Sequence, residues 1–380
     1  MIHQDQLDKL VNLRHWLHQN PELSGKENNT IDRLCRYLDG IHPDIEKVRI
    51  GKGLLVVING QAEGPTTMIR AELDALPIHE ESALPYQSMN PGISHKCGHD
   101  GHMCMVIGLA QLLSDQPPAM GRVILLFQSA EETGQGARWM LEDPEFKQYQ
   151  PDFNFALHNL PGHELGKVLL RKNTFCAASV GMKIKLKGHT AHASHPENGK
   201  SPAHAMARLA GLVVEIPQAE GAFQNFVLTT LTHMQLGEPT FGVSPGEGEM
   251  YFTLRAYLDQ DLDMLQHLIK TEADRIAKEQ GIGVEFSFHE AFEATMNHGP
   301  QVDLLEEVAK ENKLAIEYMD APNRWSEDFG LFLQQNPGAI FGLGSGLNQP
   351  ALHHPDYDFP DELIESGLTM FWGVLKKLNY

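Results

Sequence analysis

Residues 123–127 read Val-Ile-Leu-Leu-Phe, a continuous apolar run that would make both faces of a β-strand hydrophobic. Such a run is typical of a sheet that is covered on both faces. A second run of this kind follows at 153–157, and the apolar stretch 103–113 is long enough for a buried helix, with Asp100 as a candidate N-cap. Strands that alternate with helices in this way predict an α/β domain with a mainly parallel sheet flanked by helices.

The same alternation extends outward in both directions. Apolar spacing predicts a helix that Pro21 ends and a second helix that starts near Thr30. Strands are expected at 54–58 and 67–71. Near the C-terminus we expect helices at 301–312, 327–335 and 361–378, with strands at 314–318 and 339–343. Ser326 would cap the 327–335 helix, with Glu327 and Asp328 in its first turn.

A different pattern interrupts this series. Residues 180–187 alternate apolar and polar side chains, as a half-exposed strand does. The segments that follow predict the order β-α-β-β-α-β, a small two-layer α+β unit. A chain of 380 residues is also too long for one ordinary core. We therefore predict one domain built from 1–177 and 291–380, and a second domain, 178–290, inserted into it.

Composition narrows the class of protein. The hydrophobic fraction of 42% and the charged fraction of 21% are typical of a globular enzyme. A net charge of −20 argues against nucleic acid and anionic membranes as partners. No apolar run reaches the length of a membrane span, and the first residues lack the pattern of a secretory signal, so we expect a cytoplasmic location. The four cysteines match no zinc ribbon or redox pair, and only Cys97 has ligand-type neighbours.

Metal-ligand side chains occur at the ends of several predicted strands. Cys97 and His99 lie two residues apart on a glycine-containing loop, and the pair Glu131-Glu132 follows the apolar strand 123–127. His158 ends the strand 153–157, and His353-His354 lies near the C-terminus. Alone, each signal has a structural alternative: a packed core histidine or a solvated turn. Because open α/β sheets place their sites at one carboxyl edge, the combination predicts two divalent metal ions and an activated water.

Asp74 is a further candidate, because it follows the strand 67–71 and could orient a ligand histidine. The alternative is a surface ion pair with Arg70. A thiol dyad of Cys97 and His99 is another alternative for the site as a whole, but it leaves the glutamates and the other histidines unexplained.

The ordered motifs resemble a known family over essentially the whole chain. They are RHWLHQNPEL (14–23), RAELDALP (70–77), CGHDGH (97–102), FQSAEETGQGA (127–137), LHNLPG (157–162), GHTAHAS (188–194), WSEDF (325–329) and LHHPDYDF (352–359). This order is similar to that of the hippurate hydrolase and N-acyl-amino-acid amidohydrolase group of metallopeptidase family twenty. The resemblance implies a catalytic domain like that of the zinc exopeptidases, with two divalent metal ions, and an inserted lid domain that mediates homodimer formation.

Carried onto matching positions, the resemblance implies five metal ligands: Cys97, His99, Glu132, His158 and His353. His353 is preferred to His354 because the family motif is Leu-His-x-Pro. Glu131 would be the general base, and Asp74 would lie beside the metals. His192 would reach the active site of a partner subunit, and Arg255 could hold a substrate carboxylate unless it is paired to an acid.

The predicted reaction is hydrolysis of the amide bond of N-acyl amino acids or related small amides, by a metal-bound hydroxide with Glu131 as general base. The alternatives are a dipeptidase or carboxypeptidase-like peptidase, and a catalytically silent ligand-binding homologue. Zinc, manganese, cobalt and nickel are all compatible with the ligand set. One departure concerns specificity: Gly242, in Phe241–Pro245, replaces a family asparagine, so one expected side-chain contact is missing.

Overall fold

The chain divides into two compact units, and the computed structural model describes residues 3–43, 45–218 and 221–380. Unit 1 consists of Met1–Phe175, Thr295–Ala321 and Glu327–Tyr380. Unit 2 consists of Cys176–Ala294 and Pro322–Ser326. The second, short segment of unit 2 lies within residues 291–380, which the sequence pattern assigns to the other domain.

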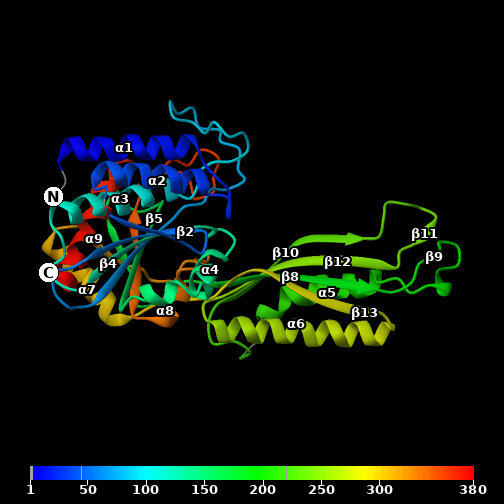
Figure 1. Cartoon of the computed structure of the whole chain (residues 1–380). Coiled ribbons are helices and arrows are strands. Elements are labelled where there is room, and N and C mark those ends of the chain that lie inside the picture. The colour runs from blue at the N-terminus through cyan, green and yellow to red at the C-terminus, as the bar shows by residue number, and fades with distance from the viewer. Residues whose placement is uncertain (1–2, 44, 219–220) are drawn as a thin grey trace. The chain divides into compact units, whose positions relative to one another are not determined.

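Unit 1 is built on an eight-stranded mixed sheet in the order β1-β2-β4-β3-β5-β16-β6-β15 (Figure 1). Its four central strands, β4, β3, β5 and β16, run parallel to one another. The strands are β1 Glu46–Ile50, β2 Gly53–Asn59, β3 Thr66–Glu72, β4 Arg122–Gln128, β5 Phe153–Leu160, β6 Val168–Leu170, β15 Ile316–Tyr318 and β16 Gly338–Gly344. A separate pair joins β7 Asn173–Cys176 to β14 Thr295–Asn297.

Helices flank this sheet, so the predicted fold class is confirmed. Helices α1, α2 and α3 lie on one side of the sheet and α4 and α8 on the other (Figure 1). The helices of unit 1 are α1 Gln4–Gln19, α2 Asn28–Ile41, α3 His99–Asp115, α4 Gly136–Glu142, α7 Gly299–Glu311, α8 Gly330–Gln335 and α9 Leu363–Asn379, with one 3₁₀ turn at Phe146–Tyr149.

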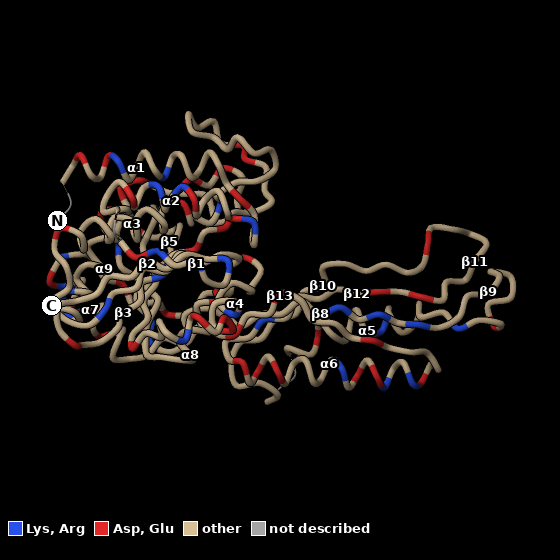
Figure 2. The backbone as a smooth tube through the Cα atoms, in the orientation of Figure 1, with Lys and Arg blue, Asp and Glu red and all other residues tan. Residues whose placement is uncertain are grey.

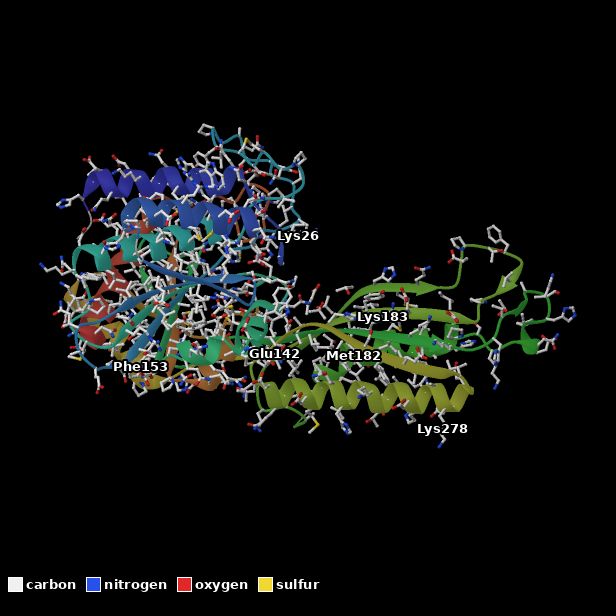
Figure 3. The ribbon with its side chains drawn as sticks, viewed as in Figure 1. Lys26, Glu142, Phe153, Met182, Lys183 and Lys278 are labelled. Atoms are coloured by element: carbon white, nitrogen blue, oxygen red, sulfur yellow. The ribbon has the colours of Figure 1, made fainter. Side chains whose placement is uncertain are left out.

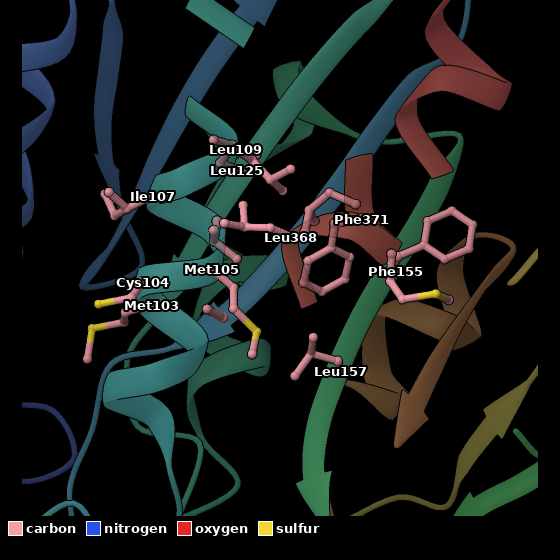
Figure 4. Close-up of a cluster of buried hydrophobic side chains, with 14 of the residues drawn as sticks. Met103, Cys104, Met105, Ile107, Leu109, Leu125, Phe155, Leu157, Leu368 and Phe371 are labelled. Carbon is pink, nitrogen blue, oxygen red and sulfur yellow. The ribbon is translucent and has the colours of Figure 1, made fainter. Parts of the chain in front are cut away.

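The core of unit 1 forms around α3, which packs against α1, α2, α9 and β3. Buried side chains of α3, including Met103, Met105 and Ile107, lie beside those of the central strands and of α9 (Figure 4). Phe155 on β5 lies near Phe371 on α9 in the same cluster. Burial of apolar surface at about 25 cal/mol per Å² is the main force that holds these layers together. The continuous apolar runs of the sequence are therefore the two-sided strands and the buried helix of this core.

The start of α3 differs from the prediction. The helix begins at His99, and its N-cap is Gly98 in the left-handed conformation (φ +94°), so the assignment of Asp100 as N-cap is wrong. The carboxylate of Asp100 is fully buried and accepts hydrogen bonds from His18 and Arg14 of α1 instead. The side chain of Asp100 therefore binds residues that are distant in sequence and does not cap its own helix.

Unit 2 has a four-stranded antiparallel sheet in the order β10-β12-β8-β13, with α5 and α6 packed against it (Figure 1). Its elements are β8 Ala178–Lys187, α5 Ala203–Glu215, β10 Val227–Leu236, β12 Glu247–Ala256, α6 Asp259–Gln280 and β13 Gly283–Phe292. A small ribbon pairs β9 Ala191–His192 with β11 Val243–Ser244, and 3₁₀ turns occupy Pro196–Asn198 and Ile216–Gln218.

One face of this sheet is apolar and the other is charged. On β8, Met182 is buried, whereas Lys183 is partly exposed and pairs with Glu249 of β12 (Figure 3). Basic residues of β8 lie alongside acidic residues of β12 (Figure 2). This alternation follows from the two-residue period of a strand with helices on one side only.

The WSEDF motif does not begin a helix at Ser326. Helix α8 starts at Gly330, and Ser326 accepts a hydrogen bond from Arg255. Glu327 and Asp328 are buried and pair with Arg70 of β3, so the predicted capping role of this motif is wrong. Among the described residues, no helix combines the length and the apolar character needed to cross a bilayer.

Candidate metal centre

Candidate site residues gather at the carboxyl ends of the parallel strands of unit 1. Asp74 follows β3, and the Glu131-Glu132 pair follows β4. His158 lies near the carboxyl end of β5. Parallel strands bring their carboxyl ends to one edge of a sheet, where α/β proteins place their sites. Cys97, on the loop before α3, and His99, the first residue of α3, lie close to His158 at this edge as well.

The five residues proposed as metal ligands lie close together. The potential ligand atoms of Cys97, His99 and His158 all lie within 4.8 Å of one another, and so do those of Cys97, Glu132 and His353. The Sγ atom of Cys97 is 3.5 Å from Nε2 of His158, and Nε2 of His99 is 4.0 Å from Oε1 of Glu132. Two groups of donors that share Cys97 form an arrangement suited to two neighbouring cations.

The two buried histidines use Nδ1 for hydrogen bonds to the backbone, while Nε2 of His99 has no partner among the described residues and Nε2 of His158 faces Sγ of Cys97. Nδ1 of His99 lies 2.9 Å from the carbonyl oxygen of Asp74, and Nδ1 of His158 lies 2.9 Å from that of Asn159. Because a carbonyl oxygen only accepts, each Nδ1 donates, so Nε2 is the ring atom through which a metal would be bound. A backbone or carboxylate partner on the other ring nitrogen is typical of histidines that bind metals.

Unpaired polar atoms show that a cation fits this donor set. His99 Nε2, Glu132 Oε1 and Asp74 Oδ1 are buried and have no hydrogen-bond partner among the described residues. Polar atoms of this kind are expensive to bury without a partner. Thiol, imidazole and carboxylate together are the ligands that zinc and similar divalent ions take. A divalent cation bound here would provide the partner that these buried atoms lack.

Charges in the cluster perturb its titrating groups strongly. Burial alone lowers the pKa of His99, but Glu72, Asp74 and Glu132 outweigh it and raise the pKa to about 10. Burial raises the pKa of the Cys97 thiol, and the charges of Glu132 and Glu131 add to the rise. Burial lowers the pKa of His158. A bound dication would reverse the effect on the thiol, because it favours the thiolate.

Glu131 is only 5% exposed and differs from Glu132 in its surroundings. Burial raises its pKa well above the ordinary value, and Glu327, Glu132 and Asp328 raise it further. Its Oε1 atom accepts a long hydrogen bond of 3.4 Å from the backbone N–H of Asp328. A carboxyl group with a raised pKa beside candidate metal ligands has the properties of a proton carrier.

Asp74 is fully buried, so the alternative of a surface ion pair with Arg70 is wrong. Its Oδ2 atom accepts hydrogen bonds from the Ser24 hydroxyl at 2.6 Å and from the backbone N–H of Glu132 at 3.0 Å. Its Oδ1 atom lies 3.4 Å from Nδ1 of His99. Asp74 thus joins two of the candidate ligands.

A buried network beside the site was not predicted from sequence. Arg70 is fully buried and pairs with Glu72, Glu327 and Asp328. Glu72 also accepts a hydrogen bond of 2.7 Å from Nδ1 of His102. The available signal was an arginine inside the apolar strand 67–71, because a buried charge requires partners.

His192 and Arg255 belong to unit 2. His192 is exposed, and its Nδ1 atom accepts a hydrogen bond from the backbone N–H of Ser194. Arg255 donates to the carbonyl of Arg324 and to the hydroxyl of Ser326. No acidic side chain of the described chain lies within ion-pair distance of it, and burial lowers its pKa.

Comparison with known proteins agrees with these features. Residues 68–377 match the model of the peptidase family M20/M25/M40. The chain is 30% identical to the N-acetylcysteine deacetylase of Bacillus subtilis, over 94% of this chain and 93% of that protein. It is also 30% identical to the hippurate hydrolase of Campylobacter jejuni, over 94% of each chain.

Solved structures show the same relationship. A dinuclear metal-binding peptidase of the M20 family from Bacillus subtilis superposes with a TM-score of 0.84 at 26% identity, over 98% of both chains. A putative aminohydrolase from methicillin-resistant Staphylococcus aureus superposes with a TM-score of 0.89 at 25% identity, over 99% of this chain and 97% of the other. The family that the motifs predicted is therefore confirmed: this chain belongs to the peptidase family M20/M25/M40 and is a hydrolase of that family.

Proposed function

We propose that the protein hydrolyses the amide bond of N-acyl amino acids or related small amides at a centre of two divalent metal ions. The ligands would be Cys97, His99, Glu132, His158 and His353. The observation that carries this proposal is the pairing of a ligand-type carboxylate, Glu132, with an adjacent buried carboxyl group, Glu131, whose pKa is raised. Relatives that deacetylate N-acetylcysteine or hydrolyse hippurate support the substrate class.

Two bound dications would supply Lewis acidity and would bring the pKa of a water molecule toward neutrality. The protein's own groups would move the proton. A carboxylate oxygen of Glu131 would accept it from the attacking water, and the same group would then deliver it to the leaving amine. Asp74 and the carbonyl of Asn159 would keep the rings of His99 and His158 oriented during turnover.

Unit 2 would contribute to substrate recognition. The half-buried guanidinium of Arg255 has only neutral hydrogen-bond partners among the described residues, which leaves its charge available for a substrate carboxylate. We further propose a homodimer formed through unit 2, in which His192 of a second subunit would stabilise the oxyanion. Sedimentation measurements would test this, because a protein that stays monomeric at assay concentrations contradicts the role of His192.

An activity screen tests the main proposal. Metal-reconstituted enzyme should be offered N-acetyl amino acids, N-benzoyl amino acids and dipeptides at equal concentrations. We expect cleavage of the N-acyl substrates, whereas preferential cleavage of dipeptides would favour the peptidase alternative. Glu131→Gln is the control: it should bind metal like the wild type and lose about 100- to 10,000-fold in kcat. Turnover at the wild-type rate by this variant contradicts the assignment of Glu131.

A further inference from the structure

The residue before the two glutamates has an unusual backbone. Ala130 is fully buried and adopts a left-handed conformation, with φ +53°. For an L-residue other than glycine this conformation is disfavoured by about five- to thirty-fold in population. Strained backbone of this kind persists only where the surroundings impose it. The carbonyl of Ala130 accepts hydrogen bonds from the backbone N–H groups of Gln135 and Gly136, which closes the turn on one side.

A carboxylate from a distant part of the chain holds the other side of Ala130. Oε1 of Glu27, at the start of α2, accepts the backbone N–H of Ala130 at 2.8 Å and that of Gly25 at 2.9 Å. Glu27 is only 2% exposed, and its Oε2 atom has no hydrogen-bond partner among the described residues. Burial and the nearby charge of Asp74 raise its pKa to about 7. Burying a carboxyl group is unfavourable by itself. The burial of Glu27 against Ala130 therefore suggests that this contact has a function.

Residues 24–27 are also linked, through Asp74, to the backbone between Glu131 and Glu132. The hydroxyl of Ser24 donates to Oδ2 of Asp74 at 2.6 Å, and that same oxygen accepts the backbone N–H of Glu132 at 3.0 Å. The backbone is therefore fixed immediately before Glu131, by Glu27, and immediately after it, by Asp74. A change in φ at Ala130 would rotate both glutamates relative to the strand β4 that carries them.

We propose that Glu27 is a positioning residue for the reaction: it holds Ala130 in the left-handed conformation. In that conformation the side chain of Glu131 is oriented for proton transfer and that of Glu132 for metal binding. This inference rests on the proposed function of those two glutamates. Glu27 makes no hydrogen bond to the side chain of Glu131 or Glu132; its Oε1 atom accepts the backbone N–H groups of Ala130 and Gly25. It also assigns a role to the residues that follow the N-terminal motif RHWLHQNPEL, which the metal centre does not use.

Glu27→Ala removes the acceptor and lets Ala130 relax. We expect kcat to fall about 100-fold with a small change in KM, because misplacement of a catalytic group by about 1 Å has an effect of that size. Zn²⁺ affinity, measured on metal-free protein in competition with a chelating dye, should fall about 10- to 100-fold through Glu132. Glu27→Gln keeps an oxygen acceptor and should stay within a few-fold of the wild type in both quantities.

Glu22→Ala is the matched control. Glu22 lies in the same segment, but its carboxylate accepts hydrogen bonds from Asn29 and Thr30 at the start of α2. It accepts none from residues 130–136, the turn that carries Glu131 and Glu132. We expect Glu22→Ala to lower the melting temperature while kcat and Zn²⁺ affinity stay near wild type. An equal loss of kcat and affinity in Glu22→Ala and Glu27→Ala would show a general structural effect and would overturn the proposal.

A second substitution at Ala130 separates positioning from stability. Glycine adopts φ +53° without steric cost, so Ala130→Gly added to Glu27→Ala should recover at least about five-fold in kcat and Zn²⁺ affinity. A double variant no better than Glu27→Ala, or a folded Glu27→Ala with wild-type kcat and affinity, overturns the proposal. If the wild type cleaves no N-acyl substrate, the proposed function fails separately, and the affinity measurements still decide the role of Glu27.

Discussion

The Nε2 atom of His353 lies 3.5 Å from Oε1 of Glu132, although the two residues belong to different sequence segments of unit 1. His353 reaches this position in a left-handed conformation (φ +65°), with its backbone N–H donating to the carbonyl of Lys96 at 2.8 Å. Its neighbour His354 faces Asp356 instead, at 3.8 Å. Backbone geometry thus makes two adjacent histidines unequal.

This inequality gives the first prediction. His353→Ala should lower Zn²⁺ affinity by at least about 100-fold, more than the loss of a residue that only orients a ligand. His354→Ala is the matched control, because its side chain is equally exposed and lies beside Asp356. Calorimetric titration of both metal-free variants measures the difference. If the two lose affinity to the same extent, His353 is not a ligand.

Thiol labelling gives the second prediction. Cys97 is buried among the candidate ligands, whereas Cys35 on α2 is partly exposed and far from them in sequence. A ligated thiolate is shielded from alkylation, so Zn²⁺ should slow the labelling of Cys97 at least ten-fold and leave that of Cys35 unchanged. Peptide mass mapping after iodoacetamide treatment reads both rates in one sample. Rapid labelling of Cys97 in the metal-loaded enzyme would favour the alternative of a nucleophilic cysteine.

The third prediction concerns Gly98, between the ligand candidates Cys97 and His99. A Cβ atom added to Gly98 would lie 2.6 Å from Oδ1 of Asn159, and its φ is +94°. Gly98→Ala should therefore destabilise the fold and weaken Zn²⁺ binding. Gly92→Ala is the control, since Gly92 also has a positive φ (+80°) but nothing within 4 Å of an added Cβ. The loss of unfolding free energy should be about 1–3 kcal/mol larger at Gly98, and equal losses would show that the contact with Asn159 is unimportant.

The fourth prediction is a pH dependence of stability. Burial alone lowers the pKa of His18, but hydrogen bonds to Asp100 and Glu80 outweigh it and raise the pKa to about 9. The ordinary value in an unfolded chain is about 6.5. Stability from this protonated ring is therefore complete below pH 6.5 and is lost as pH rises through 9, by up to about 3 kcal/mol.

Melting temperatures of the wild type and His18→Gln between pH 6 and 10 measure this contribution. The wild type should lose stability over that range, and the variant should start lower and change less. His42→Gln, at an exposed histidine that ends α2, should follow the wild type. Parallel curves for the wild type and His18→Gln would contradict the ion pairing of His18.

Local sequence was sufficient where a segment's neighbours in the chain determine its structure. The apolar runs of β4, β5 and α3 are buried on all sides, and their hydrophobic pattern alone predicted them. Prediction from local sequence failed where a polar side chain could bind either its own helix or a distant group. Asp100 could cap α3, but Arg14 and His18 bind its carboxylate. Ser326 could cap a helix, but it accepts from Arg255.

The sequence by itself determined the α/β class, the family and the candidates for the metal centre, because residue type and order carry periodicity and ligand chemistry. Tertiary structure alone decided that Arg70 is buried among three acids and that Oε1 of Glu27 accepts the backbone N–H of Ala130. Those outcomes depend on which distant groups meet in the folded chain. Hydrogen bonds and ion pairs act over only a few ångströms, so no pattern along the sequence specifies their partners.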